Sequence, residues 1–154
     1  MTFKICLDRL ESEQTRTLLA LHLAGMQQNS PPKSVFALDL SGLQRPDVTV
    51  WSIWHDEHIA GIGALRMLGG HQAEIKSMRT HPDFLRQGIG RLLLEHIVKT
   101  ARERNMVRLS LETGSGTSFE PALALYRAHG FTNGPAFGDY EKSDFNQFLH
   151  QDLI

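Results

Sequence analysis

The stretch Arg86-Gln87-Gly88-Ile89-Gly90-Arg91 decides how the rest of this 154-residue sequence is interpreted. Upstream of it, residues 73–80 (AEIKSMRT) have the composition of a strand and are followed by His81-Pro82. Downstream, apolar residues recur at helical spacing from Ile89 to Ala101. The sequence therefore predicts a strand, a glycine-rich loop and a long helix, in that order.

A glycine-rich loop at the start of a helix is a typical anion-binding site, because free backbone N–H groups and the positive end of the helix dipole point at the ligand. Arg86 and Arg91 add positive charge at the rim, and we expect a pyrophosphate to bind here. Two common pyrophosphate motifs do not fit. The dinucleotide fingerprint requires a third glycine where this chain has Leu93, and the P-loop requires Gly-Lys-Ser/Thr where it has Gly90-Arg91-Leu92.

The loop resembles the acyl-CoA loop of the GNAT superfamily of N-acetyltransferases, whose pattern is Arg/Gln-x-x-Gly-x-Gly/Ala between a strand and a long helix. A second motif, residues 122–131 (ALALYRAHGF), resembles the family's A-x-x-x-Y-x-x-x-G-F helix and turn. The chain departs from the family at two points. Leu85 occupies the first position of the loop pattern, and Thr113-Gly114-Ser115 replaces an asparagine that contacts the CoA arm in many relatives. The resemblance covers residues 51–131.

The resemblance implies an enzyme that transfers acetyl from acetyl-CoA directly to a primary amine, without a metal. It places Tyr126 near the CoA sulfur and a catalytic glutamate at Glu74. It also implies that one strand pairs through its backbone with the pantetheine arm, and that an N–H near Met78 polarises the thioester carbonyl. The residues expected to bind the cofactor are Met78, Arg79, Thr80, Arg86, Gln87, Gly88, Ile89, Gly90, Arg91 and Ser115.

Glu74 is the candidate general base. An alkylammonium has a pKa of about 10.4, so only about one molecule in a few thousand is the nucleophilic amine at pH 7, and a proton acceptor is needed. Strand alternation puts Glu74, Lys76, Met78 and Thr80 on one face of the strand. Neither face is cleanly apolar, which suits a strand that lines a cleft. The structural alternative is a Glu74–Lys76 pair at a wet edge.

Tyr126 is the candidate that assists the departing thiolate. A phenol of pKa about 10 that gives its proton to a thiol of pKa about 8.5 does so uphill by about 2 kcal/mol. We therefore expect hydrogen bonding to the developing thiolate, with full proton transfer completed later. The structural alternative is a helix tyrosine that packs on the sheet with its hydroxyl satisfied.

The composition bounds the class of protein. A chain of 17.3 kDa with 41% hydrophobic and 21% charged residues predicts a single globular domain, residues 1–154. The net charge of -1 argues against nucleic acid as a partner, and the absence of a long apolar run argues against a membrane span. One cysteine, Cys6, fits a reducing cytoplasm, and the scattered histidines indicate no metal site. A homodimer is left open.

The order of predicted elements gives an α/β fold with the GNAT arrangement: a mixed, mostly antiparallel sheet, splayed at its central strands, with helices on both faces. The predicted hairpin of residues 48–55 and 58–67 turns at Asp56-Glu57, and a last strand lies within residues 145–153. Gly61 and Gly63 indicate a bulge or a close backbone approach.

The acceptor would be recognised by residues 27–43 and 137–140. Three acids are candidates for an ammonium group and two arginines for a carboxylate: Asp39, Glu112 and Asp139, then Arg79 and Arg66. A small amine or amino-acid-like molecule is the expected acceptor. A protein lysine or N-terminus is the alternative within the class, and a non-catalytic CoA-binding module is the alternative from another class.

Overall fold

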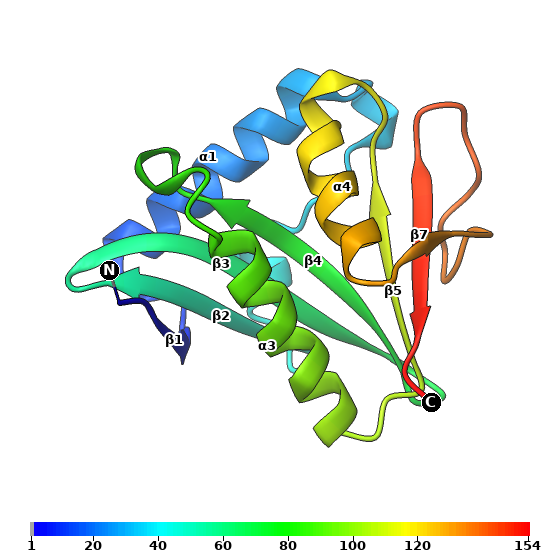
Figure 1. The fold of residues 1–154 in the computed structure, drawn as a ribbon. Helices are drawn as coiled ribbons and strands as arrows, with labels where there is room; N and C mark the ends of the chain where they lie inside the picture. Colours follow the sequence, from blue (N-terminus) through cyan, green and yellow to red (C-terminus); the bar gives the residue numbers. More distant parts are fainter. Residues whose placement is uncertain (1) are drawn as a thin grey trace.

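The structure is a computed structural model, and it describes residues 2–154. Its helices, 3-10 turns and strands are drawn in Figure 1. In chain order they are β1 (Lys4–Leu7), α1 (Glu13–Asn29), η1 (Pro32–Ser34), α2 (Leu40–Leu43), β2 (Val48–His55), β3 (His58–Gly69), β4 (Gln72–Thr80), η2 (Pro82–Phe84), α3 (Ile89–Glu103), β5 (Arg108–Thr113), η3 (Thr117–Phe119), α4 (Glu120–Ala128), β6 (Thr132–Asn133) and β7 (Gln147–Asp152).

The strands form one seven-stranded sheet in the order β1-β2-β3-β4-β5-β7-β6. Only the β4–β5 pair is parallel, and the other pairs are antiparallel. The predicted hairpin is confirmed, because β2 ends at His55 and β3 begins at His58. The mixed, mostly antiparallel α/β fold predicted from the sequence is therefore correct.

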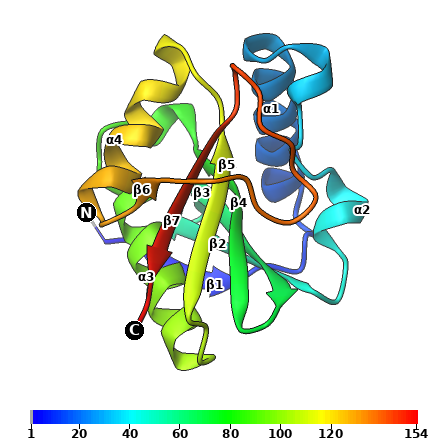
Figure 2. The ribbon, with the colours of Figure 1, turned by 90° about the vertical axis from the view of Figure 1, so that its right-hand side faces the viewer.

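Helices cover both faces of the sheet, with α3 and α4 on one face and α1 and α2 on the other (Figure 2). The larger core lies under α3 and α4, where buried residues of α3 such as Leu93 and Ile97 pack with Leu109 and Leu111 of β5. The second core lies under α1 and includes Leu18. Within residues 2–154, no helix combines the length and apolar character needed to cross a membrane.

The sheet opens between its two central strands. β4 and β5 pair only from Gln72–Arg108 to Glu74–Ser110, and beyond that point the two strands diverge, as Figure 1 shows. The remaining part of β4 pairs with β3 on one side only. This is the predicted splay, and it leaves backbone N–H and C=O groups of β4 free to bind something other than a strand.

A β-bulge lies in β4 beside the opening. Arg79 pairs with Ile62 and Lys76 with Ala64, so Ser77 and Met78 together oppose the single residue Gly63. Ser77 has a φ of 57°, a left-handed conformation that costs a non-glycine residue free energy. A Cβ at Gly63 would lie 2.6 Å from the Met78 sulfur, so the glycine makes room for the Met78 side chain. The bulge inferred from the glycines is thus present, with the extra residue in the neighbouring strand.

Candidate active site

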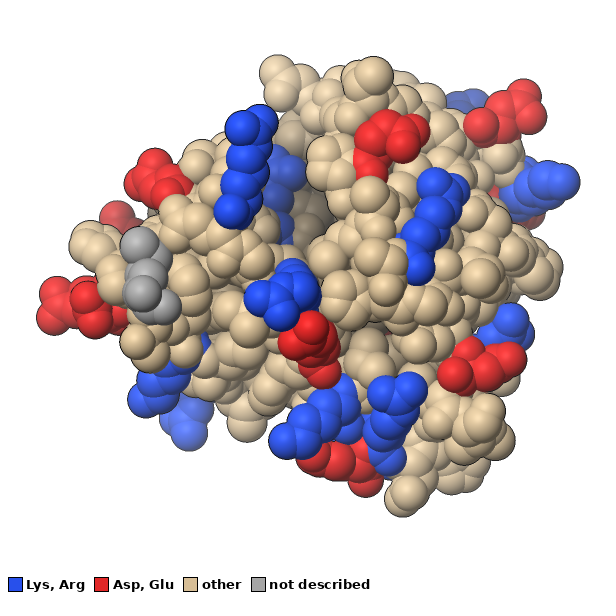
Figure 3. Space-filling view, viewed as in Figure 1, with Lys and Arg blue, Asp and Glu red and all other residues tan. Residues whose placement is uncertain are grey.

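Two pockets meet at the opening of the sheet. The first has a volume of about 150 Å³, and residues of α1, β4, β5 and α4 line it. The second, of about 450 Å³, lies between the end of β4, the start of α3 and α4. Figure 3 shows a hollow between the α4 side and the opposite part of the molecule, with Lys and Arg side chains at its rim. The residues that line both pockets are Met78, Arg79, Ser118, Ala122 and Tyr126.

Tyr126 is held in place by the turn that ends α4. Gly130 has a φ of 90°, and the N–H groups of Gly130 and Phe131 donate to the carbonyls of Arg127 and Tyr126, both at 3.1 Å. These two bonds form a Schellman motif, which needs a left-handed residue at the glycine. The turn brings the buried Phe131 ring edge-on to the Tyr126 ring, with 5.8 Å between centroids. The Gly130-Phe131 pair of the sequence motif therefore determines the position of the Tyr126 ring.

The Tyr126 hydroxyl is available to a ligand. The residue is only 6% exposed, and its hydroxyl makes no hydrogen bond within residues 2–154. Burial raises the pKa of Tyr126 well above its usual range. The group is therefore a neutral hydrogen-bond donor at physiological pH and a weak acid.

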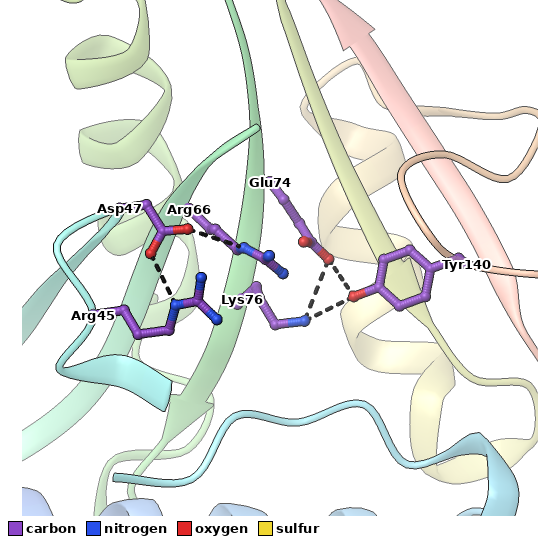
Figure 4. Close-up of polar contacts among 6 residues, drawn as sticks. All are labelled: Arg45, Asp47, Arg66, Glu74, Lys76 and Tyr140. Atoms are coloured by element: carbon purple, nitrogen blue, oxygen red, sulfur yellow. Dashed lines mark hydrogen bonds and ion pairs between the residues drawn. The ribbon is translucent and has the colours of Figure 1, made fainter. Parts of the chain in front are cut away.

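Glu74 lies where the sheet begins to open, and it is the last β4 residue paired with β5. Its side chain is buried and belongs to a small polar network that is drawn in Figure 4. The hydroxyl of Tyr140 donates to Glu74 Oε2 at 2.5 Å, and Lys76 Nζ lies 3.4 Å from the same oxygen. Lys76 Nζ also donates to the Tyr140 hydroxyl at 2.7 Å.

This network joins the two interpretations of Glu74. The Glu74–Lys76 pair of the structural alternative is present, but it is buried on a central strand rather than at a wet edge, and both side chains line the first pocket. Both donors contact Oε2, so the other carboxylate oxygen, Oε1, is not engaged in this network. Burial and the Glu74 carboxylate raise the pKa of Tyr140, which keeps its hydroxyl protonated.

Glu112 is a second carboxyl group in the first pocket. Asn146 Nδ2 donates to Glu112 Oε2 at 2.5 Å, and no cation lies within ion-pairing distance of it among the described residues. Burial raises the pKa of Glu112 in spite of the Asn146 hydrogen bond. A carboxylate with a raised pKa is a better proton acceptor, so Glu112 competes with Glu74 for the role of base.

The glycine-rich loop leads into α3, and the N-terminus of this helix has no side-chain cap. Gly88 precedes the helix with a φ of 80°. By contrast, Ser12 caps α1 and Asp39 caps α2. The free N–H groups of α3 therefore face the second pocket, which Gly90 lines. A Cβ at Gly90 would lie 3.0 Å from Leu125 Cδ2, so this glycine also serves the contact between α3 and α4.

The other predicted cofactor residues are distributed unevenly. Met78, Arg79 and Thr80 line the second pocket, but Ile89 is buried in the core. The Ser115 hydroxyl donates to the Phe145 carbonyl at 2.8 Å and lines neither pocket, which supports the role of loop residue rather than cofactor contact. Arg91 lies 3.6 Å from Glu95 of the same helix. Arg86, Gln87 and Gly88 form the loop before α3 and are not in the lining of either pocket.

The candidate acceptor residues separate in the same way. Asp39 accepts a hydrogen bond from the Gly42 N–H at 2.9 Å and is a helix cap, while Asp139 lines neither pocket. Arg66 lies 3.5 Å from Asp47 and lines neither pocket, although it stands opposite Glu74 in the β3–β4 register (Figure 4). Arg79 does line the first pocket. His22 of α1 was not anticipated, because one histidine among apolar helix positions is typical of a core residue.

The chain belongs to the GNAT family of acetyltransferases. Residues 10–131 match the Acetyltransferase (GNAT) family, which is most of the chain. The class of enzyme that the fold and the open central strands define is therefore an acetyltransferase, in agreement with the resemblance carried by the loop and the tyrosine helix.

Two bacterial relatives match nearly the full length. The uncharacterized N-acetyltransferase YedL of Escherichia coli (strain K12) is 45% identical over 147 residues, 96% of this chain and 92% of YedL. The uncharacterized N-acetyltransferase YsnE of Bacillus subtilis (strain 168) is 43% identical over 97% of this chain and 99% of YsnE. A crystal structure from Klebsiella pneumoniae, of a protein assigned to the acyl-CoA N-acyltransferases, superposes with a TM-score of 0.83 at 26% identity and covers 99% of both chains.

Proposed function

We propose that the enzyme binds acetyl-CoA in the second pocket and a small primary amine in the first, and transfers acetyl directly between them. The observation that carries this proposal is the sharing of Tyr126 and Met78 by both pockets at the opening between β4 and β5. The two substrates would approach from opposite faces of the sheet and meet at these residues.

Acetyl-CoA fits the second pocket by chemistry. The uncapped N-terminus of α3 offers N–H groups to a pyrophosphate, and the free edge of β4 offers backbone groups to the amides of the pantetheine arm. A Bacillus subtilis acetyltransferase of the same fold, 16% identical with a TM-score of 0.70, was crystallised in complex with CoA. That complex supports an acyl-CoA as the co-substrate here.

The transfer forms one bond and breaks one. The amine nitrogen attacks the thioester carbonyl carbon, and a backbone N–H at the β4 bulge stabilises the oxygen of the tetrahedral intermediate. Before this attack, the alkylammonium gives one proton to Glu74 or Glu112, directly or through water, which frees the nitrogen lone pair. The second nitrogen proton leaves as the intermediate collapses and reaches the thiolate through water. The C–S bond then breaks, and Tyr126 donates a hydrogen bond to the departing thiolate. The products are an N-acetylated amine and CoA.

A covalent cysteine intermediate has no support in this arrangement. Cys6 lies on β1 at the edge of the sheet, where its sulfur is 3.6 Å from the Ser52 hydroxyl, and it lines neither site pocket. A nucleophilic cysteine would have to contact the thioester. Transfer within a ternary complex follows.

A protein acceptor is the runner-up. The [Ribosomal protein bS18]-alanine N-acetyltransferase of Salmonella typhimurium is 35% identical over 69 residues, which is 45% of this chain. One contact argues against an extended peptide as the acceptor. The Phe36 and Tyr140 rings are 5.1 Å apart between centroids, so the segment after α1 contacts the segment before β7 beside the first pocket. This contact favours a small molecule.

A library of amines screened for free thiol release from acetyl-CoA tests the proposal. We expect at least one class of small amine to accelerate thiol release, with an equal amount of N-acetylated product by mass spectrometry. A protein that binds acetyl-CoA but shows no amine-dependent release would be the non-catalytic module instead. Release that depends on Tyr126 separates enzymatic transfer from background hydrolysis.

A further inference from the structure

The first pocket contains a guanidinium group without an acidic partner. Arg79 extends from β4 toward α1, where a Cβ at Gly25 would lie 2.5 Å from its Nη2. Its one hydrogen bond is a long contact of 3.5 Å to the Leu21 carbonyl, and within residues 2–154 no carboxylate lies within ion-pairing distance. Burial lowers the pKa of Arg79, but a guanidinium stays charged. This cation therefore has room for an anionic ligand.

His22 lies beside Arg79 with an unused ring nitrogen. Its side chain is 7% exposed, its Nδ1 has no hydrogen-bond partner, and it lines the same pocket. Burial, then the charges of Arg79 and Lys76, lower the pKa of His22 to about 4. The imidazole is therefore neutral at pH 7 and can donate one N–H to an anion. An unpartnered buried polar atom is costly, and a ligand atom is one way to satisfy it.

Ser77 adds a third donor. The bulge of β4 turns this residue into a left-handed conformation, and its hydroxyl is buried in the pocket lining without a partner. Arg79, His22 and Ser77 thus supply donors from two elements, α1 and β4. Their combined charge is +1, which matches a single carboxylate.

The complementary charge is provided elsewhere in the same pocket. Glu112 has no cationic partner among the described residues, while Lys76 is already paired with Glu74. The pocket therefore has one free cation on the α1 side and one free carboxyl group on β5. A ligand with an ammonium and a carboxylate satisfies both, and a plain alkylamine satisfies only one.

We propose that the acceptor is an amino acid or a similar amine that carries a carboxylate, and that Arg79 and His22 hold that carboxylate. The proposal rests on the proposed acetyl transfer and names the substrate class of its first pocket. The carboxylate contact would fix the amine in the direction of Glu112 and the thioester. Arg79 then determines specificity and takes no part in proton transfer.

Matched pairs of amines test the proposal: alanine with ethylamine, leucine with isopentylamine, and phenylalanine with phenethylamine. For each pair, kcat/KM is measured by thiol release in the wild type, Arg79→Gln, Arg79→Lys and Arg108→Gln. We expect the amino acid to be preferred by the wild type. Arg79→Gln should lower the ratio of the two kcat/KM values roughly 10- to 100-fold, the usual effect of a lost charged hydrogen bond. In Arg79→Lys this ratio should lie between those of the wild type and Arg79→Gln.

The comparison of kcat/KM ratios between variants removes the effect of amine basicity. The amino acid and its decarboxylated partner differ in amine basicity, but that difference is the same in every variant. Arg108→Gln is the matched control, because Arg108 lies at the far end of β5, pairs with Asp152 at 3.4 Å and lines neither pocket. Its ratio should stay within about twofold of the wild type. O-phosphoethanolamine tests a phosphate in place of the carboxylate.

Each outcome has one meaning. Three outcomes would overturn the carboxylate proposal and leave acetyl transfer intact. They are equal kcat/KM for both members of every pair, an unchanged ratio of kcat/KM in Arg79→Gln, and a higher kcat/KM for O-phosphoethanolamine than for the amino acids. If no amine is acetylated, the proposed function fails. Calorimetric binding of N-acetylphenylalanine against N-acetylphenethylamine then judges the carboxylate site alone, with tighter binding of the former supporting it and equal binding overturning it.

Discussion

Tyr126 and Glu74 show what a sequence can predict about single residues. Both were expected in the site, and both line the first pocket at the sheet opening. Their partners were not expected. Tyr140 lies 66 residues from Glu74 in an irregular segment, and no periodicity indicates such a contact. The left-handed Ser77 and the unpartnered His22 also depend on tertiary packing, which spacing along one strand or helix does not reveal.

Replacement of Tyr126 by Phe tests the role of the hydroxyl. Because that hydroxyl makes no hydrogen bond within residues 2–154, its removal should leave the fold and acetyl-CoA affinity nearly unchanged. If it assists thiolate departure, kcat should fall by roughly 10² to 10⁴. Steady-state kinetics and calorimetry on the same preparation measure both quantities. Wild-type kcat in Tyr126→Phe would show that the tyrosine is structural.

The two carboxyl groups are separated by pH profiles of Glu74→Gln and Glu112→Gln. Loss of the base should reduce activity most near pH 7, where the amine is protonated, and activity should recover partly toward alkaline pH as the amine loses its proton without help. A structural role gives a loss that does not vary with pH. We expect the alkaline recovery in Glu74→Gln. Recovery in Glu112→Gln alone would transfer the role to Glu112, whose pKa is already raised by burial.

At the scale of elements, local patterns predicted the order of strands and helices well. The loop before α3, the β2–β3 hairpin and the turn after α4 each depend on residues close in sequence, such as Gly88, Asp56-Glu57 and Gly130. The two-residue strand β6 was not predicted, because Thr132–Asn133 pairs with β7 without any pattern of its own. The family resemblance rather than strand periodicity supplied the splay between β4 and β5.

The bulge can be tested through Gly63. A Cβ there would meet the Met78 sulfur at 2.6 Å and Ile97 Cδ1 at 3.1 Å, so Gly63→Ala should destabilise the fold by about 1–3 kcal/mol in chemical denaturation. It should also weaken acetyl-CoA binding, because Met78 would be displaced at the junction of the pockets. In the double variant Gly63→Ala/Met78→Ala the two losses should be less than additive. Full additivity would mean that Gly63 does not make room for Met78.

At the scale of the whole molecule, two pockets meet at the opening between β4 and β5. Residues of α3 and α4 line the second pocket, and residues of α1 and α4 line the first. The helices α3 and α1 lie on opposite faces of the sheet (Figures 1 and 2). A small-molecule acceptor, the absence of nucleic acid and membrane partners, a possible homodimer and a cytoplasmic location stay predictions from the sequence.

Buried His22 makes the stability of the molecule sensitive to acid. Its pKa falls from 6.5 to about 4 on folding, so between these values the unfolded state binds more protons than the folded state. The free energy of unfolding is therefore unaffected by His22 above pH 6.5. It decreases as the pH falls from 6.5 toward 4, by about 3 kcal/mol in total. Urea denaturation of wild type and His22→Asn across this range measures it. Equal slopes of stability against pH in the two proteins would contradict the prediction.

Binding of acetyl-CoA is the central claim, and a ligand comparison by thermal unfolding tests it most directly. The loop provides backbone N–H groups but neither the third glycine nor the lysine that dinucleotide and ATP sites use. Acetyl-CoA at about 100 times its Kd should stabilise the protein by about 2.7 kcal/mol and raise its Tm, whereas NAD and ATP at the same concentration should leave Tm unchanged. Equal or greater stabilisation by NAD or ATP would contradict the account.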